Sequence, residues 1–137
     1  MSPETAWSGA GSGCTTLNTA PADQDPGVTH CSGRAIADIS AVADPYTGPA
    51  VYAPNRRGPS SWQQYGGTSL SSPIIASVFA LAGSTSDYPN DLLYTASASS
   101  FNDVTSGRNG RCTYWCTAQP GWDGPTGLGT PNGISGF

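Results

Sequence analysis

One long apolar run, residues 70–82, dominates a chain otherwise rich in glycine, proline and small polar residues. Pro73 suits the first turn of a helix, where its missing N–H costs nothing. Gly83 suits the position just after the last turn. The run therefore predicts a buried helix, on which the rest of the chain would pack. Its large side chains are Leu70, Ile74, Ile75, Val78, Phe79 and Leu81.

Length and charge exclude several classes of protein. The 137 residues make one domain or part of one. Only 10% of the residues are charged, against about 25% in ordinary domains. There is no lysine and the net charge is −4, so no basic stripe exists to bind nucleic acid. No apolar run approaches the ~20 residues of a membrane span, so no membrane partner is expected.

The remaining elements are short and separated by turns. We expect a strand at residues 35–42, ended before Pro45, because Ile36 and Val42 are apolar at even spacing. Two further strands, at residues 50–53 and 61–65, would form a hairpin. Elsewhere we expect a turn at residues 23–27, a second helix at residues 90–98 and loops over residues 101–137.

Four cysteines indicate an oxidising compartment. An even number in a small, lysine-free chain suggests disulfides, with three pairings possible among Cys14, Cys31, Cys112 and Cys116. The local pairs need the least rearrangement of the chain, and a Cys14–Cys31 bridge would contribute roughly 3 kcal/mol on the chain-entropy model. A metal site on these cysteines is disfavoured, because there is no C-x-x-C and His30, the only histidine, reads as a surface residue.

Ser69 is the candidate nucleophile. It follows Gly66 and Gly67, which allow a sharp turn and leave room for a substrate, and it precedes the apolar run. At a helix N-terminus the dipole and free N–H groups favour a developing oxyanion. Ser is also a preferred N-cap residue, so a purely structural role explains its position equally well.

The longer motif favours catalysis. Gly67-Thr68-Ser69-Leu70-Ser71-Ser72-Pro73, followed at once by the helix, resembles the nucleophile motif of subtilisin-like serine peptidases. The flanking segments narrow this to the sedolisin family, the serine-carboxyl peptidases. Residues 34–48 resemble the strand and loop before the family's nucleophile, residues 4–9 are also similar, and residues 101–107 and 121–131 resemble its calcium-binding segment.

The resemblance also shows what this chain lacks. In the family a Glu activates the serine, an Asp orients that Glu and a further Asp holds the oxyanion, all well upstream of the nucleophile. Glu4 is the only glutamate here, and its context matches a later part of the pattern. A serine hydroxyl without a base is a weak nucleophile, so we expect the isolated chain to be inactive.

A structural calcium site is implied by the same resemblance. The matching positions supply two carboxylates, Asp103 and Asp123, and three backbone carbonyls, those of Val104, Gln119 and Gly121. Hard oxygen ligands on irregular backbone suit Ca²⁺. Without the resemblance, both aspartates would be taken for turn formers. The family usually has Gly where Gln119 stands. Trp115 and Trp122 are expected to pack rather than to bind substrate.

The resemblance implies an α/β fold, the C-terminal portion of a subtilisin-like fold with a parallel sheet, covering helices and calcium-binding loops. Residues 1–137 would form the C-terminal segment of a sedolisin-like peptidase domain, without its upstream catalytic part. No signal peptide follows Met1, which suggests a piece of a longer, secreted precursor. The parent would hydrolyse peptide or protein substrates through an acyl-enzyme on Ser69, in acid. The alternative is a non-catalytic, calcium-stabilised, disulfide-bearing structural or binding fragment.

Overall fold

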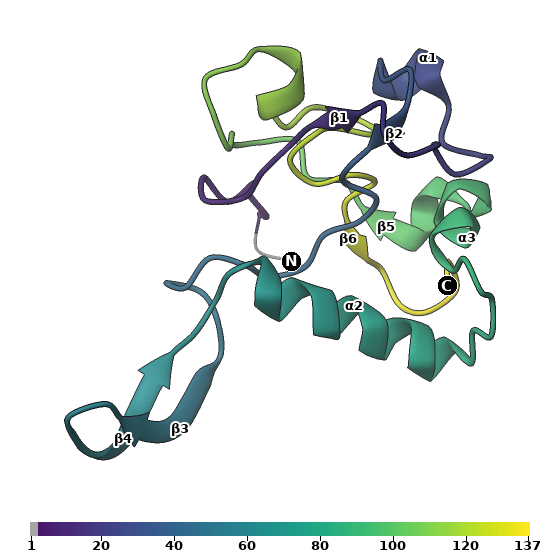
Figure 1. Cartoon of the computed structure of the whole chain (residues 1–137). Helices are drawn as coiled ribbons and strands as arrows, with labels where there is room; N and C mark the ends of the chain where they lie inside the picture. Colours follow the sequence, from purple (N-terminus) through teal and green to yellow (C-terminus); the bar gives the residue numbers. More distant parts are fainter. Residues whose placement is uncertain (1–2) are drawn as a thin grey trace.

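The computed structural model describes residues 3–137, so Met1 and Ser2 of the expected segment lie outside the described residues. The chain forms three helices, short 3-10 turns and three two-stranded sheets joined by long loops (Figure 1). The helices are α1 (Pro26–Thr29), α2 (Thr68–Ala82) and α3 (Asn90–Thr95), with 3-10 turns at Ala98–Ser100 and Tyr114–Cys116. No helix within residues 3–137 is long and apolar enough to cross a membrane.

Each sheet is a pair of antiparallel strands. Strand β1 (Cys14–Thr15) pairs with β2 (Arg34–Ala35), β3 (Ala50–Asn55) with β4 (Gly58–Gln64), and β5 (Phe101–Asn102) with β6 (Thr130–Pro131). The expected parallel sheet is therefore not found among the described strands. The only parallel pairing within residues 3–137 is an isolated bridge between Ala6 and Gly107.

The strand expected at residues 35–42 is reduced to Arg34–Ala35, and residues 36–43 are irregular. Asp38 in the middle of this segment is buried, which the alternating pattern did not foresee. Along one edge the segment is bonded to the chain near Gly129, but its other edge has no neighbouring strand. Asp38 is held by the side chains of Gln24, Asn90 and Tyr94, contacts that the alternation of a regular strand does not provide, which explains the difference.

The predicted hairpin is confirmed by β3 and β4, which pair Tyr52 with Trp62 and contain a register shift between Ala53 and Asn55. It projects from the body of the molecule, beside the N-terminus of α2 (Figure 1). Tyr52 and Trp62 contact each other edge to face and are both exposed.

The predicted long helix is confirmed as α2, but it is not buried. It begins at Thr68, two residues earlier than expected, so Pro73 lies inside the helix rather than in its first turn. Gly83 ends it in the left-handed conformation, with φ 74°. None of its residues is buried, and Leu81 is 75% exposed. Too little of the described chain lies against α2 to cover an apolar helix of this length.

The core lies instead among the loops. Cys31, Ala35 and Trp122 form its centre, and Tyr94, Tyr114, Trp115 and Leu128 pack against it. The Trp115 and Trp122 rings meet edge to face with centroids 5.8 Å apart, which confirms their expected packing role. Disulfides Cys14–Cys31 and Cys112–Cys116 are both formed, so the local pairing is confirmed.

The buried carboxylate of Asp38 is the centre of a hydrogen-bonded cluster beside this core. Asp38 accepts hydrogen bonds from Arg34, Asn90, Tyr94 and Gln24, and the Tyr94 bond is 2.6 Å long. Burial raises the pKa of the Tyr94 hydroxyl well above its usual range, and the hydrogen bond to Asp38 and the charge of Asp38 add to it. Burial lowers the pKa of Arg34, but its hydrogen bond to Asp38 and the charge of Asp38 outweigh this, so the pKa is raised.

Candidate functional site

Two glycines place Ser69 at the start of α2. A Cβ on Gly66 would lie 2.5 Å from the Ala43 carbonyl oxygen and 2.5 Å from the Pro45 nitrogen, so only glycine fits there. Gly67 has φ 94° and donates its N–H to Ala43 at 2.5 Å. Position 67 thus needs a left-handed conformation in a tight turn, and Ser69 follows as the second residue of the helix.

Gly67, and not Ser69, is the N-cap of α2. No side chain caps the helix, and within residues 3–137 the Thr68 and Ser69 N–H groups have no partner, whereas the Leu70 N–H donates to the Gly67 carbonyl at 2.9 Å. The structural alternative, in which the Ser69 hydroxyl caps the helix, is therefore not what the structure shows. The free N–H groups and the helix dipole would favour an oxyanion beside Ser69.

Ser69 is exposed, and within residues 3–137 no side chain or backbone group hydrogen-bonds its hydroxyl. Two residues later, Ser71 is engaged differently, since it donates to the Ala41 and Val42 carbonyls at 3.1 and 3.0 Å. Glu4 accepts a hydrogen bond from Thr130 at 2.7 Å, so it ties the N-terminal segment to β6. His30 is exposed and packs edge to face on Tyr114.

The two candidate metal-binding aspartates lie close enough to influence each other. Burial raises the pKa of the Asp123 carboxyl, and the charge of Asp103 raises it further, although hydrogen bonds from Gln119 and Thr126 lower it. Asp123 is 0% exposed and accepts from Gln119 N–H at 3.0 Å and from the N–H and hydroxyl of Thr126, both at 2.8 Å.

Asp103 is exposed and accepts a single hydrogen bond from the described residues, from Gly121 N–H at 2.9 Å. The carbonyl oxygens of Val104, Gln119 and Gly121 accept no hydrogen bond from residues 3–137. Two adjacent carboxylates with three free carbonyls nearby are a donor set that suits Ca²⁺, so the residues present fit the expected ion. Residues 3–137 contain no cluster of three or more His, Cys, Asp or Glu side chains, so carbonyl ligands would be essential.

The loops that hold this set are tied together locally. Asp123 and Gly127 exchange backbone hydrogen bonds of 3.0 and 2.9 Å, and an antiparallel bridge joins Arg108 to Thr117. Cys112–Cys116 stiffens the loop between the two aspartates, with Cα atoms 5.2 Å apart across a sequence separation of 4. This arrangement would keep Asp103 and Asp123 close together without regular secondary structure.

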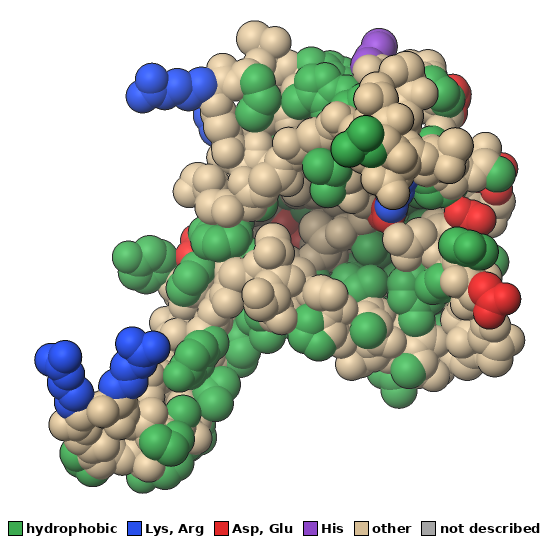
Figure 2. Space-filling model, viewed as in Figure 1, with side chains coloured by type: hydrophobic (Ala, Val, Ile, Leu, Met, Phe, Trp, Pro, Cys, Tyr) green, Lys and Arg blue, Asp and Glu red, His purple; other side chains and the backbone are tan. Residues whose placement is uncertain are grey.

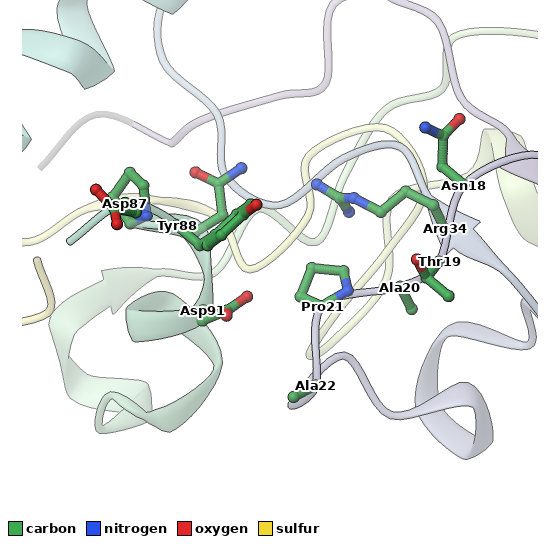
Figure 3. Close-up of a pocket in the computed structure, with 11 residues that line it drawn as sticks. Asn18, Thr19, Ala20, Pro21, Ala22, Arg34, Asp87, Tyr88 and Asp91 are labelled. Carbon is green, nitrogen blue, oxygen red and sulfur yellow. The ribbon is translucent and has the colours of Figure 1, made fainter.

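Neither large cavity contains Ser69, Asp103 or Asp123. One, of about 610 Å³, lies between residues 18–22 and residues 87–91, with the Arg34 side chain reaching toward it (Figure 3). The other, of about 600 Å³, lies between α2 and residues 36–43. The Asp38 cluster between them was missed from the sequence, because Arg34 and Asp38 lie outside any helix, where a four-residue spacing does not predict an ion pair.

The sequence is similar to those of known peptidases. The chain is 36% identical over 118 residues to tripeptidyl-peptidase sed1 of Aspergillus fumigatus, covering 80% of this chain and 17% of the relative. It is 36% identical over 121 residues to kumamolisin of a Bacillus species, covering 83% of this chain and 20% of the relative. No protein-family model matches the chain.

A solved structure of Pseudomonas sedolisin, a serine-carboxyl proteinase complexed with two molecules of pseudo-iodotyrostatin, is similar to this fold with a TM-score of 0.75. The match has 32% sequence identity and covers 95% of this chain but 39% of sedolisin. The chain thus spans about a fifth of the length of the curated relatives above and two-fifths of the sedolisin chain. By sequence and by fold, the chain is a homologue of sedolisin-family peptidases over the segment that it shares with them.

Proposed function

We propose that this chain is the nucleophile-bearing segment of a serine-carboxyl endopeptidase, in which Ser69 attacks the scissile carbonyl and forms the acyl-enzyme. The observation that carries the proposal is the position of Ser69, exposed on the first turn of α2 beside free backbone N–H groups, in a homologue of this family's peptidases. Peptides or proteins would be the substrates of the complete enzyme, secreted and working in acid.

The chain's own residues supply part of this chemistry. The turn at Gly66 and Gly67 presents the hydroxyl, and the N–H groups of the first turn of α2 would hold the oxyanion. Proton transfer needs a base within about 2.6–3.2 Å of the hydroxyl. No group of residues 3–137 hydrogen-bonds the Ser69 hydroxyl, so the carboxylates would come from the part of a sedolisin domain outside this chain.

A serine-directed fluorophosphonate probe tests this role. The chain alone is expected to label at Ser69 at a background level, matching a Ser69→Ala variant, because the hydroxyl has no base. Stoichiometric labelling of the chain alone would contradict the division of the site between this chain and another segment. Labelling in a reconstituted or full-length enzyme, lost in Ser69→Ala, would support the nucleophile.

Calcium would have a structural role. We propose that Asp103, Asp123 and the carbonyls of Val104, Gln119 and Gly121 bind it, joining the loop after β5 to the loop before β6. Adding Ca²⁺ to the chelated chain should raise its thermal midpoint, since an ion bound only by the folded state stabilises it. Asp103→Asn should abolish that shift. Asp87→Asn, at an exposed aspartate outside the loops, should keep it.

A non-catalytic role is the second candidate, favoured by the absence of any hydrogen bond to the Ser69 hydroxyl within residues 3–137. In that case the disulfides and the calcium loops would support a binding or structural fragment. Ser69 would then stay unlabelled even in a complex with the remaining part of a sedolisin domain.

A further inference from the structure

The β3–β4 hairpin concentrates positive charge on an otherwise acidic chain. Arg56 and Arg57 lie in the turn between the two strands, and both are exposed. They are two of the five cations of a chain whose net charge is −4, and residues 46–67 contain no aspartate or glutamate. Within residues 3–137 neither arginine takes part in a salt bridge. Figure 2 shows cationic side chains at the outer end of the hairpin, away from the body of the molecule.

The turn that carries these arginines is held by Asn55. The Asn55 side-chain amide donates to the Pro59 carbonyl at 2.7 Å and to the Ser61 hydroxyl at 2.9 Å, so one side chain joins both strands across the turn. Arg56 and Arg57 are therefore presented side by side on a turn of defined shape. A preformed surface loses less conformational entropy when a ligand binds.

An aromatic pair lies further along the same hairpin. Tyr52 and Trp62 are directly opposite each other in the strand register, so their side chains share one face. Their ring centroids are 5.6 Å apart, and the residues are 60% and 71% exposed. Such a pair stabilises the hairpin by itself. It also leaves much of both rings accessible to an apolar group of a ligand, and it does not explain the unpaired arginines.

The order of these features along the hairpin disfavours two other roles. A hairpin that enters a membrane needs apolar residues at its tip, because charge in hydrocarbon is costly, and here the tip carries Arg56 and Arg57. Burial of the tip within a larger fold would leave two guanidinium groups without carboxylate partners, which is also costly. The tip is therefore suited to an anionic ligand that binds in water.

The hairpin leads directly into the nucleophile turn. Strand β4 ends at Gln64 and α2 begins at Thr68, so Ser69 follows after a short turn. The base of the hairpin is closed by a hydrogen bond of 3.1 Å from the Tyr65 N–H to the Pro49 carbonyl. A ligand that extends along the hairpin from its tip would thus run toward the N-terminus of α2 (Figure 1).

We propose that the β3–β4 hairpin is a second binding site for the polypeptide substrate, and that it binds an extended acidic segment away from the scissile bond. Arg56 and Arg57 would bind Asp or Glu side chains through charge-assisted hydrogen bonds. The exposed Tyr52–Trp62 pair would pack on a neighbouring apolar side chain. The inference rests on the proposed function and names its substrate class. A polypeptide is favoured over an acidic polysaccharide, because the relatives are peptidases and the hairpin adjoins Ser69.

Fluorescence anisotropy with the full chain tests the inference at a pH of about 6, where glutamate is ionised. The probe is the fluorescein-labelled peptide Glu-Ser-Glu-Phe-Glu-Ser-Glu, and its control has every glutamate replaced by glutamine. The acidic peptide should bind at least about tenfold more tightly than the control. The difference should shrink at high salt, because ions screen exposed charges. Replacing the phenylalanine of the probe by serine should weaken binding about threefold, through loss of the aromatic contact.

Substitution of the two arginines locates the site. Arg56→Gln combined with Arg57→Gln should weaken binding of the acidic peptide at least about fivefold. Neither side chain is hydrogen-bonded within residues 3–137, so the hairpin should keep its fold in this variant. The matched control, Arg108→Gln combined with Arg111→Gln, removes the same charge from another exposed loop and should leave binding within about twofold.

Three results would overturn the inference. They are equal binding of the acidic peptide and its glutamine control, equal effects of the two double substitutions, or an affinity that is unchanged when the phenylalanine is replaced. Displacement of the probe by polygalacturonate or by phosphatidylserine vesicles, at a lower concentration of charges than the unlabelled peptide needs, would also overturn it. That result would assign the hairpin to a polysaccharide or to a membrane surface.

The nucleophile is read separately from this site. Ser69→Ala should bind the acidic peptide as the unmodified chain does, because Ser69 lies outside the hairpin. A complete enzyme that binds the peptide through the hairpin but does not label at Ser69 would refute the proposed nucleophile and keep the second site. Labelling at Ser69 without any preference for the acidic peptide would refute the second site alone.

Discussion

The loops around Asp123 and the helix α2 differ in burial and in regular secondary structure, and each region has the property that the other lacks. Residues 122–127 are all buried although they contain no helix or strand, whereas α2, the longest regular element, has no buried residue. The loops are held by Trp122, the Asp123 hydrogen bonds and the disulfides. Regular secondary structure and burial are thus separate properties, and in this chain the loops contain the core.

The largest expected effect comes from removing the centre of that core. Trp122→Ala should lower the free energy of unfolding by about 3–5 kcal/mol, because Trp122 is 5% exposed and packs on Trp115, Cys31 and Ala35. Denaturant titration measures it. A cost below about 1 kcal/mol would show that the loops are not where the stability lies.

Asp123→Ala should have the second-largest effect. It should lower the free energy of unfolding by roughly 2–3 kcal/mol in the presence of a chelator. The Gln119 and Thr126 N–H groups and the Thr126 hydroxyl would lose their buried acceptor. Thermal unfolding in EDTA separates this from calcium binding. The matched control, Asp87→Ala at an exposed aspartate, should stay within about 0.5 kcal/mol.

Tyr94→Phe should lower the free energy of unfolding by about 1–1.5 kcal/mol, because the Tyr94 hydroxyl donates to Asp38 and accepts from Gln24. Because the folded state raises the pKa of Tyr94, its contribution is complete below the unfolded pKa of about 10 and falls as the pH rises above it. Unfolding measured from pH 8 to 11 should therefore show a weaker alkaline loss in the variant. An unchanged alkaline slope would contradict the role of Tyr94.

The smallest effect is expected on α2. Leu81→Ala should change the stability of the isolated chain by less than about 0.5 kcal/mol, although it lies in the most apolar segment, because Leu81 is 75% exposed. Denaturant titration beside Trp122→Ala gives the comparison directly. A cost of 2 kcal/mol or more would mean that α2 is packed in a way that its exposure does not show.

How far the sequence predicted the molecule depends on the range of the interactions involved. Helix α2 and the hairpin followed from local signals, the apolar run and the turn residues beside it. The strand at residues 35–42 was wrong because Asp38 draws its partners from Gln24, Asn90 and Tyr94, far apart in the chain. Local periodicity does not encode such contacts.

The candidate site shows the same division. Ser69 and its glycines could be found from their spacing, because the turn and the helix start are local. Asp103 and Asp123 lie 20 positions apart, and only the family resemblance singled them out from other turn aspartates. Burial of α2 was predicted from its composition, and within the described residues this prediction was wrong, because a composition does not say how much of the chain packs on the helix.

Hydrogen exchange of the isolated chain tests the central contrast most directly. A helix of 15 residues that is at most half-buried on one face gains little from packing, so α2 amides should exchange through local opening at a lower free energy than the buried Asp123 and Gly127 amides. We predict protection in the loops to exceed that in α2 by at least about tenfold. Equal or greater protection in α2 would show that the helix is stable without a partner and contradict the account.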